Sequence, residues 1–144
     1  MTRYEASARL ALNADEAWRK IGDFGAVGEW HPLLKSVESE GNAPGDLRLA
    51  EGGDGSRQVE RLTHYNTDAQ CYRYEMVETA LPVRNYTSEF RIDPTENESC
   101  VVRWSAEFEI TQEDEKAGES MISGFLEAGT DALEKLHGST EDRL

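Results

Sequence analysis

The residue types that can transfer protons gather in the middle of the chain. Glu60 and His64 lie in a segment that alternates like a β-strand, 57–65, and this alternation places both side chains on one face. Tyr74 occupies the next predicted strand, 70–79. A carboxylate, an imidazole and a phenol can each act as a general acid or base. Glu60, His64 and Tyr74 are therefore the candidate catalytic residues. Each also has a structural interpretation, because histidines near strand ends are often solvated and tyrosines often bury their rings.

Arg48 offers a partner for one of these groups. The glycine-rich segment Gly52–Gly55 is typical of a hairpin tip, and a hairpin with this tip places Arg48 opposite Glu60. Left unpaired, a carboxylate on the inward face can serve as a general base. Paired with Arg48, it is ionised and either supports the fold or orients the polar head of a ligand. We favour the pair.

Other chemistries find no support in the sequence. The three histidines, His31, His64 and His137, are too scattered for a metal site, and Ser88 has no histidine or acid close in register to activate it. The glycine-rich tip lacks the following helix and the lysine of a nucleotide-binding loop. We therefore predict neither a metal nor a cofactor. His31, which precedes a proline, is expected at the mouth of any cavity.

The elements that must position these residues are mostly strands. From Ala117 to Leu136, apolar or small residues recur every three or four positions, which indicates one long amphipathic helix. Such a helix at the end of a strand-rich chain needs a curved sheet to pack against. The predicted elements are a strand at 2–12, a short helix at 14–22, a helical turn at 24–27, strands at 33–40, 47–51, 57–65, 70–79, 86–93 and 99–110, and a helix at 113–137.

Short antiparallel connections fix an expected register. They place Leu62 opposite Tyr74, Tyr74 opposite Phe90, and Phe90 opposite Trp104, all on the inward face, with charged residues on the other face. Either an ordinary core or a ligand cavity can result where this face meets the helix. The predicted ligand-binding residues are Arg48, Glu60, Leu62, Tyr72, Tyr74, Met76, Tyr86, Ser88, Phe90, Trp104, Phe108, Met121 and Phe125.

Composition limits the classes of partner. The chain has 144 residues and a formal net charge of −14, so nucleic acid and anionic membrane surfaces would repel it. No run of residues is apolar enough for a membrane span or a signal region, which predicts no stable membrane insertion and a cytoplasmic location. We expect one domain over 1–144, with 139–144 as a disordered tail, and a monomer or homodimer.

Short sequence pieces recur in a fixed order along the whole chain. They are Trp18-x-x-Ile21-x-Asp23-Phe24, Trp30-x-Pro32, Gly45-Asp46-Leu47-Arg48, Glu60-Arg61-Leu62 with Asp68, Tyr72-x-Tyr74-x-Met76, Leu81-Pro82-Val83-x-Asn85-Tyr86, and Val102-x-Trp104 with Phe108. In order and spacing they resemble the SRPBCC superfamily, in its bacterial polyketide cyclase/dehydrase-like branch. The superfamily also includes START lipid-transfer domains and the birch-pollen allergen. The resemblance implies an α+β helix-grip fold, with a seven-stranded bent antiparallel sheet wrapped around a long C-terminal helix and two short helices after the first strand.

The resemblance implies a function no finer than a class, because the superfamily has no shared catalytic motif. Our first hypothesis is binding or transport of a small hydrophobic molecule, of lipid, polyketide or aromatic type, in a cavity between sheet and helix. The second is a metal-free cyclase or dehydratase that uses acid–base residues in that cavity. The third is a protein-interaction module with a closed core. The sequence does not decide whether the protein is an enzyme.

Overall fold

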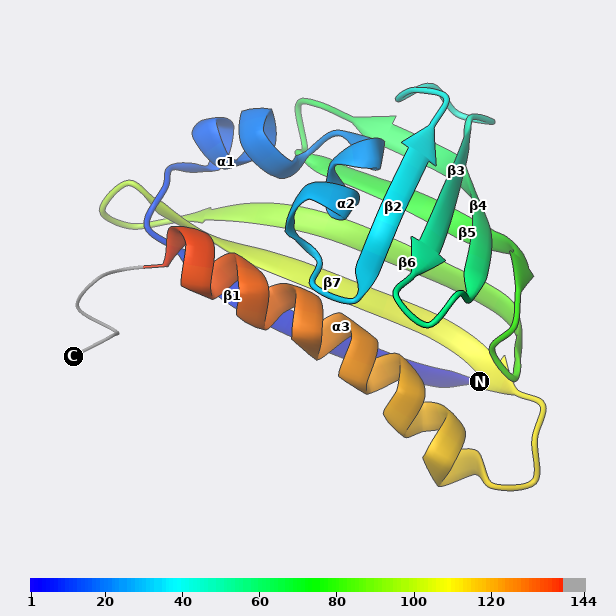
Figure 1. Ribbon diagram of the computed structural model, residues 1–144. Coiled ribbons are helices and arrows are strands. Elements are labelled where there is room, and N and C mark those ends of the chain that lie inside the picture. Colours follow the sequence, from blue (N-terminus) through cyan, green and yellow to red (C-terminus); the bar gives the residue numbers. More distant parts are fainter. Residues whose placement is uncertain (139–144) are drawn as a thin grey trace.

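The computed structural model describes residues 1–138, so the predicted tail at 139–144 lies outside the described residues. The predicted α+β helix-grip fold is confirmed: one antiparallel sheet, in the order β1-β7-β6-β5-β4-β3-β2, bends around the long helix α3 (Figure 1). The elements are β1 (Thr2–Leu10), α1 (Ala14–Ile21), a 3₁₀ turn η1 (Phe24–Ala26), α2 (Val27–Trp30), β2 (Leu34–Ser39), β3 (Leu47–Gly52), β4 (Arg57–Asn66), β5 (Cys71–Thr79), β6 (Val83–Thr95), β7 (Ser99–Ile110) and α3 (Glu115–His137).

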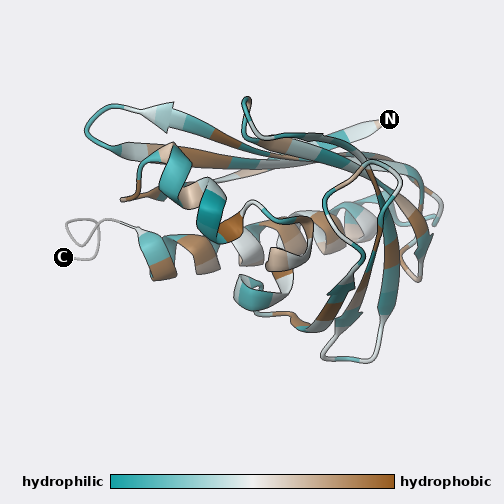
Figure 2. Ribbon diagram, turned by 90° about the horizontal axis from the view of Figure 1, so that it is seen from above, coloured by the Kyte–Doolittle hydropathy of each residue, from teal (hydrophilic) through white to brown (hydrophobic). Residues whose placement is uncertain are grey.

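The sheet has one buried and one wet face because its strands alternate in side-chain type. Figure 2 shows brown and teal residues alternating along the strands. Tyr72, Phe90 and Trp104 are buried on the inward face. On the outer face, charged residues pair across neighbouring strands, as Arg73 does with Glu89 at 2.7 Å. The inward face is therefore the wall of the core.

Helix α3 ends at His137, as predicted, and begins at Glu115 rather than at residue 113. The Asp114 side chain accepts a hydrogen bond from the Ala117 amide at 3.0 Å, which satisfies one of the free amides of the first turn. The helix buries one stripe against the sheet, made of Ile122, Leu126, Gly129, Thr130 and Leu133 together with Gly118. Within residues 1–138, no helix is both long and apolar enough to cross a membrane.

The expected strand register is right in two places and wrong in one. Leu62 lies opposite Tyr74, and Phe90 lies opposite Trp104, as predicted. Tyr74 lies opposite Ser88, whereas Phe90 pairs with Tyr72. A shift of two residues keeps each side chain on its predicted face. The shift arises because β6 begins at Val83 rather than at residue 86, which shortens the turn between β5 and β6.

A bulge in β4 overturns the prediction for His64. The register shifts between Leu62 and His64, so His64 lies opposite Arg73 on the exposed outer face. The extra residue reverses the alternation, and Tyr65 turns toward the core in its place. The Tyr65 hydroxyl donates to the carbonyl of Gly22 at 3.1 Å. The predicted proton-transfer histidine therefore does not face the interior.

Candidate functional site

A buried ion pair occupies one half of the interior. Arg48 and Glu60 lie opposite each other on β3 and β4, as the hairpin predicted. The Arg48 Nε and Nη2 atoms each lie 2.9 Å from Oε1 of Glu60. Arg48 is 1% exposed and Glu60 is 5% exposed. The favoured interpretation, a paired carboxylate, is confirmed.

Aromatic rings enclose the guanidinium of this pair. Its Cζ lies 4.1 Å from the ring centre of Phe24 and 4.6 Å from that of Tyr74, and its Nη1 donates to the Phe24 carbonyl at 2.7 Å. Burial alone would lower the pKa of Arg48, but Glu60 and the hydroxyls of Tyr72 and Tyr74 outweigh it and raise that pKa. The guanidinium is thus permanently charged, and its neighbours leave this half of the interior closed.

The inward tyrosines serve as hydrogen-bonding core residues. Tyr72 and Tyr74 are buried, and the Trp104 indole N–H donates to the Tyr74 hydroxyl at 3.1 Å. Burial raises the pKa of Tyr74, and it raises that of Tyr86 well above its ordinary value. At neutral pH these phenols are protonated, so they can donate a hydrogen bond but cannot act as bases.

His31, expected at a cavity mouth, is buried beneath a cavity wall. The Leu33 amide donates to its Nδ1 at 3.2 Å, so Nε2 carries the proton and donates to the Phe125 carbonyl at 2.8 Å. Its ring stacks on the Phe125 ring with centroids 4.0 Å apart. Burial lowers the pKa of His31 to about 4. His31 is therefore neutral at physiological pH and joins α3 to the segment before β2.

Because His31 has a lower pKa in the folded than in the unfolded chain, we expect acid to destabilise the fold through it. The unfolded chain binds a proton near the ordinary histidine pKa of about 6.5, and the folded chain does not until about pH 4. The contribution of His31 to the free energy of unfolding is present above pH ~6.5 and is lost as the pH falls toward 4. The loss amounts to about 3 kcal/mol.

The measurement is urea unfolding of the wild type and of His31→Gln across this pH range. The variant is expected to lose less stability on acidification than the wild type. His64→Gln is the control, because His64 lies exposed on the outer face of the sheet. Equal pH slopes for the wild type and His31→Gln would contradict the assignment.

An apolar cavity of about 700 Å³ lies at the other end of the interior, next to this histidine. It opens between α3, the segment before β2, the β3–β4 hairpin and the β5–β6 loop. Two apolar side chains at this site are unusually exposed, Leu33 at 51% and Met121 at 49%. The lining residues are Pro32, Leu33, Leu34, Ala50, Gly52, Gly53, Asp54, Ser56, Gln58, Leu81, Met121, Gly124 and Phe125.

Few of the predicted ligand-binding residues reach this cavity. Met121 and Phe125 line it, but Met121 does not pack between sheet and helix as expected, because the buried stripe of α3 follows Ile122 and Leu126 instead. Met76 is half-buried. The others are buried in the core: Arg48, Glu60, Leu62, Tyr72, Tyr74, Tyr86, Ser88, Phe90, Trp104 and Phe108.

Sequence reasoning missed the lining that comes from loops. Leu33 was assigned to a strand, Leu81 to a connection, and Asp54 to a flexible hairpin tip. The sequence did carry one signal. Leu33 and Leu81 each stand next to a proline, in an irregular segment that is less suited than a strand to burying a large apolar side chain in the core. A second signal was Gly124 itself, because a glycine inside a helical pattern often has a packing or functional reason. In the structure it is exposed and has open space at its Cβ position.

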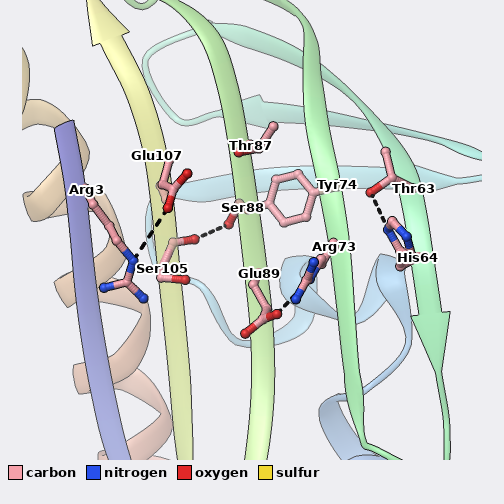
Figure 3. Close-up of a pocket in the computed structure, with 11 residues that line it drawn as sticks. Arg3, Thr63, His64, Arg73, Tyr74, Thr87, Ser88, Glu89, Ser105 and Glu107 are labelled. Carbon is pink, nitrogen blue, oxygen red and sulfur yellow. Dashed lines mark hydrogen bonds and ion pairs between the residues drawn. The ribbon is translucent and has the colours of Figure 1, made fainter. Parts of the chain in front are cut away.

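A second hollow, of about 440 Å³, lies on the outer face of the sheet (Figure 3). It brings together Tyr74, Ser88 and His64 from the predicted sets. Its charged groups already neutralise one another, with Arg73 on Glu89 at 2.7 Å and Arg3 on Glu107 at 3.8 Å. The Ser88 hydroxyl is used within the sheet, where it donates to the Ser105 carbonyl at 2.7 Å. This hollow is polar and unsuited to a hydrophobic molecule. Among residues 1–138, no group of three metal-ligating side chains could hold a metal ion.

Comparisons with known proteins agree with the fold. The XoxI protein of Bacillus cereus is 23% identical, with a TM-score of 0.88 over 98% of this chain and 99% of its own. A Thermobifida fusca structure is 29% identical, with a TM-score of 0.82 over 96% and 94% of the two chains.

A plant enzyme shares the fold at lower similarity. Norcoclaurine synthase of Thalictrum flavum, solved in complex with dopamine and hydroxybenzaldehyde, is 23% identical, with a TM-score of 0.72 over 94% of this chain and 85% of its own. A sequence search of curated proteins found no match. The family model described as "polyketide cyclase / dehydrase and lipid transport" matches residues 1–138. The chain belongs to this family.

Proposed function

We propose that this protein binds a small hydrophobic molecule, of lipid, polyketide or aromatic type, in the apolar cavity beside α3. Membership of a family that includes lipid transport supports a hydrophobic ligand. The observation that carries the proposal is the cavity itself, whose volume of about 700 Å³ falls within the ~300–1,000 Å³ typical of small-molecule sites. A bound ligand would cover the exposed side chains of Leu33 and Met121.

The geometry favours binding over acid–base catalysis. Leu34, Leu81 and Phe125 supply apolar walls, so removal of apolar surface from water is the main driving force available to a ligand. Glu60 and Tyr74 do not line this cavity, and both are engaged in the closed half of the core. The ligand would therefore bind without touching the candidate catalytic residues.

Filling the cavity from α3 tests the proposal. Gly124→Leu places a side chain into the open space at the Cβ position and is expected to weaken binding of the fluorescent apolar probe N-phenyl-1-naphthylamine at least about tenfold. The same change is expected to raise the stability of the fold by about 1 kcal/mol, because leucine is a better helix former than glycine. Fluorescence titration measures the affinity, and urea unfolding measures the stability.

Ser120→Leu provides the matched control, because Ser120 is exposed on the same helix one turn earlier and does not line the cavity. It is expected to bind the probe like the wild type. The proposal is wrong if the wild type gives no saturable binding of the probe, or if Gly124→Leu binds it as tightly as Ser120→Leu does.

A further inference from the structure

The polar part of the cavity lining is confined to one side. Asp54, Ser56 and Gln58 all come from the β3–β4 hairpin, whereas α3, the β5–β6 loop and the segment before β2 contribute apolar side chains. A ligand in this cavity therefore has its apolar body between α3 and Leu81 and its polar end at the hairpin.

The charge at this polar end has a single sign. Asp54 is the one charged residue among those that line the cavity in the described part of the chain. The cations Lys35 on β2 and Arg57 at the start of β4 do not line the cavity. The whole chain carries a formal charge of −14, which attracts cationic ligands and repels anionic ones.

Two polar groups of the hairpin are free to meet a ligand. The Ser56 amide and hydroxyl both donate to Oδ1 of Asp54, at 3.0 and 2.6 Å, which orients the carboxylate, and no other side chain of residues 1–138 pairs with its Oδ2. These hydrogen bonds lower the pKa of Asp54, so the carboxylate is ionised at neutral pH. The half-buried amide of Gln58 makes no side-chain hydrogen bond to any described residue.

From this arrangement we infer that the ligand is an amphipathic amine: an apolar chain or ring system whose cationic ammonium group meets the free Oδ2 of Asp54 and the amide oxygen of Gln58. A carboxylate or phosphate at the same end would meet a fixed anion and no cation. Fatty acids and other anionic lipids are therefore poor ligands. This inference rests on the proposed apolar site and adds the chemical class of its ligand.

Competition among probes with one apolar body tests the inference. Decylamine, decanol and decanoate share their chain and differ only in the polar end, and each is titrated against bound N-phenyl-1-naphthylamine at neutral pH and low ionic strength. Decylamine is expected to displace the probe at a concentration at least about fivefold lower than decanoate does, with decanol between them. Added salt is expected to shrink this ratio because it screens exposed charges.

Two variants that each remove one negative charge show whether Asp54 causes the preference for the amine over the acid. Asp54→Asn keeps the Oδ1 acceptor for Ser56 and removes the charge, and it is expected to reduce the amine-to-acid ratio about threefold. Glu38→Gln, on the exposed side of β2, is expected to leave the ratio nearly unchanged.

The outcomes separate the two claims. If the fluorescent probe binds but decanoate competes as well as decylamine, or if Asp54→Asn and Glu38→Gln behave alike, the amine inference is overturned and the apolar site stands. If neither the fluorescent probe nor any of the three compounds binds, the site itself is wrong.

Discussion

Replacing Glu60 by Leu is expected to lower the free energy of unfolding by about 3–5 kcal/mol, because it leaves the buried guanidinium of Arg48 without its counter-ion. Arg48 is shielded from water, since the rings of Phe24 and Tyr74 pack on its guanidinium and its exposure is 1%. Urea unfolding at neutral pH gives the loss directly.

A double-mutant cycle separates the charge from its packing. Combining Glu60→Leu with Arg48→Met removes both charges and keeps much of the apolar volume, so the double variant is expected to be more stable than Glu60→Leu alone. Glu75→Gln serves as the control, since Glu75 pairs with Arg61 at 3.0 Å on the exposed face of β4 and β5. It is expected to cost less than about 1 kcal/mol. A loss from Glu60→Leu as small as that from Glu75→Gln would show that the interior pair is in contact with water.

Two glycines of α3 are expected to respond in opposite directions to alanine. A Cβ at Gly129 would lie 2.6 Å from Cζ3 of Trp104, 2.8 Å from Cδ2 of His31 and 3.0 Å from Cζ3 of Trp30. Three buried rings cannot all withdraw, so Gly129→Ala is expected to destabilise the fold by about 2–3 kcal/mol even after the gain in helix propensity.

Gly124→Ala is the matched control on the same helix. It meets nothing within 4 Å and is expected to stabilise the fold by about 1 kcal/mol. Thermal or urea unfolding of the two variants side by side gives the comparison. A Gly129→Ala protein as stable as Gly124→Ala would mean that α3 lies farther from the sheet than these distances require.

The parts of the structure that depend on local pattern could be predicted from the sequence. The Arg48–Glu60 pair followed from a hairpin tip rich in glycine, because a short turn fixes the register of the two strands that it joins. The amphipathic period of α3 and its end at His137 likewise follow from residue types near in sequence.

Other parts depend on tertiary packing and could not be predicted. The bulge that exposes His64 has no mark in the sequence, since Thr63, His64 and Tyr65 all suit a regular strand. The cavity exists because the hairpin and α3 do not meet, and the distance between two elements is not encoded in either one. Met121 was expected between the sheet and the helix. It lies beside the stripe of α3 that contacts the sheet, and the helical pattern alone does not show how the helix is rotated about its axis.

The order of strands in the sheet also governs when the molecule can assemble. Among the strands of residues 1–138, β1 pairs with β7 alone, with Thr2 opposite Phe108 and Leu10 opposite Cys100. Next to β1, the Ala11 amide donates to the His137 carbonyl at 2.7 Å. During synthesis, β1 leaves the ribosome long before its partner β7. The hairpins of β3 to β7 can form locally meanwhile, whereas adding β1 and α3 requires contacts between segments far apart in sequence, which form slowly. Until then β7 presents an unpaired strand edge that can pair with another chain. The nascent protein is therefore most prone to aggregate during this interval.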